Sequence, residues 1–129
     1  MWRQRRQFYR VKSPLSKNSY LRLVLEDQSF VDMKLYDLSI TGFSFLYEPA
    51  HGLDEALKLH SEFKDCLLVL EATGEAPISF EIFNILPLNP NKPDKTKKIG
   101  CQFIAITPAF ESRIQRYMQQ IERENKQKN

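Results

Sequence analysis

The tightest constraint on the fold is an alternation of apolar and polar residues that occurs twice in succession. Leucines recur at every second position from Leu21 to Leu25, and Val31, Met33 and Leu35 repeat the same spacing. Four polar residues, 26–29, separate the two stretches. Because successive side chains of a strand point to opposite faces, the pattern predicts strands at 20–25 and 31–36 joined by a turn. A chain with this hairpin is expected to build a sheet with one buried face.

Shorter apolar runs continue the sheet toward the C-terminus. Residues 72–75 separate two of these runs and are typical of a hairpin turn. The segment 89–98 contains Pro90, Pro93 and four lysines, so it predicts an exposed connection. The pattern of 51–63 fits either a short helix or a loop. Further strands are expected at 43–47, 66–71, 78–85 and 99–103.

One helix is predicted at the end of the chain, over residues 107–126. Thr107 and Pro108 suit an N-cap and the first helical residue. The apolar positions that follow are spaced by four, three and four residues, which places them on one face; they are Phe110, Ile114, Tyr117 and Ile121. The expected fold is all-β with one C-terminal helix, a six-stranded antiparallel barrel whose closure removes the sheet edges. At 129 residues the chain is expected to form a single domain, 1–129.

The first twelve residues form a cationic arm, which is expected to be flexible. They hold five of the 19 basic residues and no acidic residue, whereas the rest of the chain has 14 basic against 16 acidic side chains. A local excess of arginine before a balanced body is typical of binding to an anionic, phosphate-bearing partner. A solvated terminal tail is the alternative, but the apolar residues Phe8, Tyr9 and Val11 indicate that the arm runs into the core.

A second polar motif follows the second alternating stretch. Asp37 and Ser39 are two positions apart, and Gly42 comes three positions later. On an extended backbone such side chains point the same way, so the carboxylate and the hydroxyl are expected to face one ligand edge. Gly42 allows a tight turn or the close approach of a ligand. Taken alone, these residue types favour an ordinary turn.

Together, Arg6-x-x-x-Arg10 and Asp37-x-Ser39-x-x-Gly42 resemble the PilZ domain family. The resemblance covers nearly the whole chain, because PilZ domains are six-stranded antiparallel barrels with a C-terminal helix. It implies that the chain binds the bacterial second messenger cyclic di-GMP (c-di-GMP), without catalysis and without another cofactor. Arginine can form a bidentate contact with phosphate or guanine, and Asp37 can accept hydrogen bonds from the guanine N1–H and N2–H. The binding residues implied are Arg5, Arg6, Arg10, Asp37, Ser39 and Gly42.

Three further stretches, 5–11, 35–39 and 115–124, resemble family members that act as flagellar brakes. Those members carry another β-domain in front, so the chain is expected to be either a stand-alone relative or an excised half. Ligand binding would order the arm and change the surface shown to a protein partner such as the flagellar motor. Arg5 directly precedes the arginine motif, as in members that bind c-di-GMP as an intercalated dimer.

Two other functions fit parts of the sequence. A small β-barrel could bind RNA or single-stranded DNA through the arm, with Phe43, Phe45 and Tyr47 as stacking residues, although such a stripe is more often core. An interaction module that binds no nucleotide is disfavoured, because both motifs are complete. Because the complete motifs favour c-di-GMP, nucleic acid is not the expected ligand either.

Catalysis and metal binding have little support in the sequence. The two histidines and two cysteines, at 51, 60, 66 and 101, match no zinc spacing and no pairing of nucleophile with base. Cys66 and Cys101 lie in apolar runs, which is typical of buried, reduced thiols. No apolar stretch approaches the roughly 20 residues of a membrane span. We therefore expect a cytoplasmic protein without membrane insertion.

Overall fold

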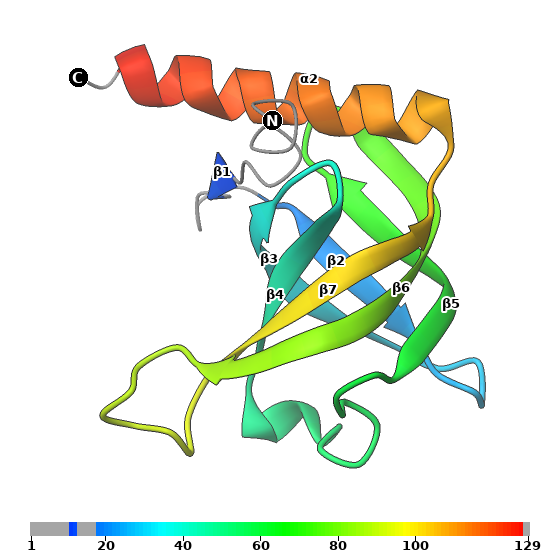
Figure 1. The fold of residues 1–129 in the computed structure, drawn as a ribbon, viewed down its shortest axis with the longest axis vertical. Helices are drawn as coiled ribbons and strands as arrows, with labels where there is room; N and C mark the ends of the chain where they lie inside the picture. The colour runs from blue at the N-terminus through cyan, green and yellow to red at the C-terminus, as the bar shows by residue number, and fades with distance from the viewer. Residues whose placement is uncertain (1–10, 13–17, 128–129) are drawn as a thin grey trace, which may run out of the picture.

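Six antiparallel strands form a closed barrel (Figure 1). The computed structural model describes residues 11–12 and 18–127, with side chains as far as Glu124. The strands follow the order β3-β2-β5-β6-β7-β4, and a further pairing of β3 with β4 closes the circle. The predicted fold class is confirmed. The strands are β2 (Tyr20–Val24), β3 (Phe30–Leu38), β4 (Gly42–Tyr47), β5 (Glu62–Leu70), β6 (Gly74–Pro87) and β7 (Lys97–Ala105).

A short additional strand, β1 (Val11–Lys12), pairs with the last two residues of β3. Val11 lies opposite Leu38 and Lys12 lies opposite Asp37. The last two residues of the predicted arm therefore belong to the sheet. The arm residues 1–10, which include Arg5, Arg6 and Arg10, lie outside the described part of the chain.

The alternating leucines point into the barrel, as the period-two pattern predicts. Leu21, Leu23 and Leu35 are fully buried. An aromatic cluster fills the space beside them, with the Phe43 and Phe80 rings packed edge to face at 5.1 Å. Phe43 and Phe45 belong to this core, so they are not available to stack nucleic-acid bases.

The middle of the chain differs most from expectation. The strand predicted to start at 66 begins at Glu62, because a bulge between Phe63 and Cys66 lets polar positions join the ladder. The strand predicted to start at 78 begins at Gly74, which pairs with Leu70 in the regular part of the ladder. The ambiguous segment 51–63 is mainly a loop, because the 3₁₀ turn η1 (Pro49–His51) ends at its first residue, turns follow, and β5 begins at Glu62. The Tyr47 hydroxyl fixes this segment, since it donates to Asp54 Oδ1 at 2.6 Å and accepts from the Leu53 amide at 2.8 Å.

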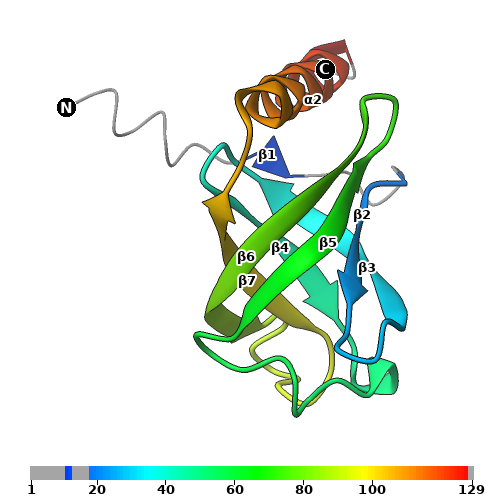
Figure 2. The ribbon, with the colours of Figure 1, turned by 90° about the vertical axis from the view of Figure 1, so that its right-hand side faces the viewer.

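Helix α2 (Pro108–Gln127) lies across one end of the barrel (Figure 2). Its N-terminus is capped by Thr107, whose Oγ1 accepts a hydrogen bond from the Phe110 amide at 3.1 Å. The four apolar residues that defined the predicted face are all buried: Phe110, Ile114, Tyr117 and Ile121.

A buried polar contact fastens α2 to the barrel, and its removal has a measurable consequence. The Tyr117 hydroxyl and Ser19 Oγ are 2.5 Å apart, and Ser19 Oγ also accepts from the Glu71 amide. We expect Tyr117→Phe to lower the free energy of unfolding by about 1–2 kcal/mol, because it leaves a buried hydroxyl short of a partner. Urea unfolding measures this difference. Tyr20→Phe is the control and should be nearly neutral; equal stability of both variants would contradict a role for the contact.

Candidate functional site

Ser39 and Gly42 build the turn between β3 and β4. Strand β3 ends at Leu38, so Ser39 does not continue the extended backbone on which the sequence argument placed it. Its hydroxyl is fully buried and accepts the amides of Thr41 and Gly42, both at 3.2 Å. These hydrogen bonds hold the turn that follows Asp37.

Gly42 is required by the close approach of two strands. A Cβ at this position would lie 2.1 Å from the Cys101 carbonyl oxygen of β7, a distance that no side chain can adopt. The sequence left either a tight turn or the close approach of a ligand open at Gly42, and the structure shows the close approach of β7 there. The lack of a side chain at Gly42 therefore allows β4 and β7 to pack closely at the end of the motif.

Asp37 begins a row of residues that crosses the outer wall of the barrel. The strand registers place it opposite Lys12 of β1 on one side and Ser44 of β4 on the other. Ser44 is opposite Gly100 of β7, which is opposite Asn84 of β6. Ser44 Oγ donates to Asp37 Oδ1 at 2.5 Å, and both residues are buried. The row brings a carboxylate, a hydroxyl and an amide together from strands far apart in the sequence.

Gly100 leaves a depression in the middle of this row. The cavity measures about 250 Å³ and is lined by Asp37, Ser44, Phe83, Asn84, Lys98 and Gly100. A Cβ at Gly100 would lie 3.2 Å from Asn84 Cβ and 3.4 Å from Phe83 Cζ, so a side chain there would occupy the bottom of the depression. The absence of a side chain at Gly100 lets a flat group approach the backbone.

Asn84 supplies an observation that points to a ligand. Its Oδ1 is buried and has no hydrogen-bond partner within the described ranges. Such an atom costs about 1–3 kcal/mol when it is left unpaired, and it is usually satisfied by another molecule or by a functional contact. A ligand that donates a hydrogen bond into the depression would satisfy it.

Two β-bulges border the row. Tyr36 is the extra residue of β3 next to Asp37, and Phe83 is the extra residue of β6 next to Asn84. Bulges redirect side chains and occur often beside binding sites. Here one aromatic residue is placed at each end of the polar row, and Phe83 is 40% exposed.

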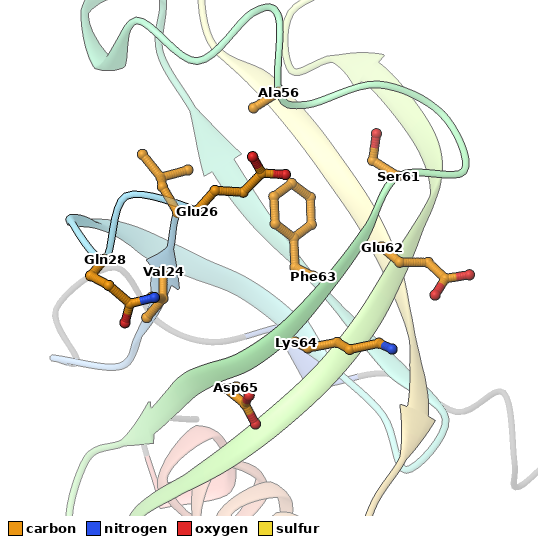
Figure 3. Close-up of a pocket in the computed structure, with 10 residues that line it drawn as sticks. Val24, Glu26, Gln28, Ala56, Ser61, Glu62, Phe63, Lys64 and Asp65 are labelled. Carbon is orange, nitrogen blue, oxygen red and sulfur yellow. The ribbon is translucent and has the colours of Figure 1, made fainter.

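A larger cavity lies beside the end of β2 and the start of β5 (Figure 3). Figure 1 shows that these ends of the two strands lie away from α2. It measures about 550 Å³, and none of the motif residues lines it. Its lining contains three acidic residues, Glu26, Glu62 and Asp65, and a single basic residue, Lys64 (Figure 3). This acidic lining is unfavourable for a phosphate-bearing ligand, so the smaller depression is the better candidate.

The structure thus places Asp37 in the depression and Ser39 and Gly42 in the turn beside it. Sequence reasoning missed Ser44, Phe83, Asn84, Lys98 and Gly100. Only Gly100 carried a usable signal, because a glycine inside a strand pattern marks a bulge or a close approach. Within residues 11–12 and 18–127 there is no cluster of His, Cys, Asp and Glu suited to a metal ion. In the same part of the chain no helix is long and apolar enough to cross a membrane.

The closed barrel, the polar depression on its wall and the helix across one end define a small β-barrel domain. The family model of the PilZ domain matches residues 4–120. The chain belongs to the PilZ domain family.

Comparisons with single proteins agree with this membership. The flagellar brake protein YcgR of Chromobacterium violaceum is 28% identical over 124 residues, which cover 95% of this chain and 49% of that protein. The solved PilZ domain of YcgR from Escherichia coli, a structure with c-di-GMP, is 25% identical with a TM-score of 0.72 and 97% of each chain covered. The K. pneumonia MrkH–c-di-GMP complex has the same fold, with a TM-score of 0.77 at 20% identity over 94% of this chain and 54% of that one. The chain spans about half the length of the curated relatives it matches.

Proposed function

We propose that this chain is a c-di-GMP receptor domain. The observation that carries the proposal is the row Asp37–Ser44–Gly100–Asn84. This row forms a polar depression directly beside β1, the strand with which the arginine arm ends. The similarity to a PilZ domain solved with c-di-GMP supports this choice of ligand.

One guanine base would lie flat on Gly100. Asp37, held by Ser44, accepts hydrogen bonds from the guanine N1–H and N2–H, and Asn84 Oδ1 accepts another donor. Phe83 covers one face of the base, and stacking of this kind contributes about 1–3 kcal/mol per base. Adenine does not offer the same pair of donors to a carboxylate, so this arrangement selects guanine.

The arm completes the site. The depression, at about 250 Å³, is smaller than the roughly 300–1,000 Å³ of typical ligand pockets, so much of a cyclic dinucleotide extends beyond it. Arg6 and Arg10 would hold the phosphodiesters with bidentate contacts, and Arg5 would support a second, intercalated ligand. Ser39 and Gly42 hold the turn that positions Asp37.

The receptor would act as an effector without a catalytic step. Ordering of the arm changes the charge and shape of the surface next to β1, and a protein partner then distinguishes the two states. The similarity to flagellar brake proteins favours the flagellar motor as that partner. Two free, buried cysteines suit a reducing cytoplasm.

Calorimetric titration tests both the ligand and its stoichiometry. We expect c-di-GMP to bind the wild-type chain with two ligands per chain, because an additional guanidinium offsets the repulsion of four phosphodiester charges. Arg5→Leu should bind one. A wild-type ratio of one would contradict the intercalated dimer but not the receptor. Tight binding of an oligothymidylate with no heat from c-di-GMP would favour the nucleic-acid alternative and overturn the proposal.

A further inference from the structure

Two lysines from different strands lie against the same aromatic ring. The Lys12 ammonium is 5.3 Å from the centroid of the Tyr36 ring, and the Lys98 ammonium is 5.4 Å from the same centroid. The two charges are therefore separated by no more than the sum of these distances. Tyr36 is the bulged residue of β3 that directly precedes Asp37.

The strand registers explain how these side chains meet. Lys12 of β1 lies opposite Asp37, so its side chain leaves the sheet beside Tyr36. Lys98 of β7 lies opposite Leu46 of β4 and also lines the depression. To reach Tyr36 it extends across β4 toward β3. The two ammonium groups therefore approach Tyr36 from opposite sides, at the end of the depression where Asp37 lies.

In the part of the chain that the structure describes, neither ammonium group forms a salt bridge. Within the described residues no carboxylate lies in ion-pair distance of Lys12 or Lys98. A cation over a ring face keeps N–H donors for other acceptors. Two like charges near one ring repel each other, and an anion bound between them would reverse the sign of that interaction.

We propose that Lys12, Tyr36 and Lys98 form a phosphodiester subsite, distinct from the arginine arm. The identity of the ligand as c-di-GMP rests on the proposed function, whereas the affinity of the two lysines for a phosphate group does not. The polar row holds the guanine, and the lysine pair holds the phosphodiester attached to it. Lysine suits this position because it acts as a point charge and needs no planar bidentate partner.

Charge-removing variants test the subsite. At low salt we expect Lys12→Gln and Lys98→Gln each to weaken c-di-GMP binding by roughly 3- to 20-fold. This range lies between the effect of losing an exposed ion pair and that of losing a charged hydrogen bond. The slope of affinity against salt concentration should also decrease in both variants. Lys98→Arg keeps the charge and should bind within about 3-fold of wild type, a rescue that a purely structural role does not predict.

Lys64→Gln is the matched control, because it removes one lysine at the rim of the other cavity. If Lys12→Gln and Lys98→Gln bind c-di-GMP as well as Lys64→Gln does, the subsite is overturned.

A probe without bases separates this inference from the proposed function. Pyrophosphate titrated into the wild-type chain should shift the NMR signals of the Tyr36 ring and the Lys98 ε-methylene group more than those of Lys64. If c-di-GMP fails to bind but these shifts appear, the proposed ligand is wrong and the phosphate subsite remains. Signals of Tyr36 and Lys98 that do not move, or that move no more than those of Lys64, overturn the subsite.

Discussion

Replacing Arg6 or Arg10 by alanine is expected to weaken c-di-GMP binding by roughly 30-fold to more than 1,000-fold. Each change deletes a bidentate contact to a phosphodiester or a guanine, and truncating one partner of a desolvated charge pair costs about 2–5 kcal/mol. Arg5 is assigned to a second ligand, so it is not expected to replace either contact. Calorimetry with each purified variant measures the loss.

Arg3→Ala is the matched control, since it removes the same charge from the same arm outside the motif. We expect it to bind within about 2-fold of wild type, the effect of an exposed charge. Equal losses for Arg3, Arg6 and Arg10 would contradict a specific site and indicate general attraction between the arm and any polyanion.

Gly42→Ala is expected to destabilise the barrel by about 3 kcal/mol or more. The new Cβ would stand 2.1 Å from the Cys101 carbonyl oxygen, and backbone atoms on both sides have to move. Overpacking lowers the free energy of unfolding by about 1–3 kcal/mol where neighbouring side chains can move aside. The loss is expected to be larger here, because the neighbouring atom belongs to the backbone. The midpoint of thermal unfolding should fall by about 10 °C.

Gly52→Ala serves as the comparison for this variant. Gly52 has a φ of 70° and nothing within 4 Å of its added Cβ, so alanine there meets only backbone strain. That strain costs about 1–2 kcal/mol. If Gly42→Ala is no less stable than Gly52→Ala, then β4 and β7 can separate more easily than their contact indicates.

The regular parts of the fold could be predicted because they depend on local pattern. Leu21, Leu23 and Leu35 point inward as their spacing requires. In α2 the Thr107 cap and the buried face follow from residues within a few positions of one another. Such elements need no knowledge of distant partners.

The depression could not be predicted, because it depends on strand registers between distant segments. Ser44, Gly100 and Asn84 become neighbours only through the β4–β7 and β6–β7 pairings. The bulge at Tyr36 shifts the β3–β4 register by one residue, the bulge at Phe83 shifts the β6–β7 register by one residue, and no short motif predicts either bulge. A ligand contact of Ser39 stays a prediction, because the residue lies one position beyond β3 and its hydroxyl accepts the amides of Thr41 and Gly42.

The pairing of β1 with β3 would determine where the arm meets the proposed ligand. Val11 is buried in the core and Lys12 lies opposite Asp37, so the chain is fastened beside the depression at a fixed point. A segment joined to a binding site by so short a connection acts at an effective concentration in the millimolar range. Contacts that would be weak between separate molecules would then suffice to hold the proposed ligand. Only Val11 separates Arg10 from Lys12. The affinity for the ligand is therefore expected to depend on the length of this connection.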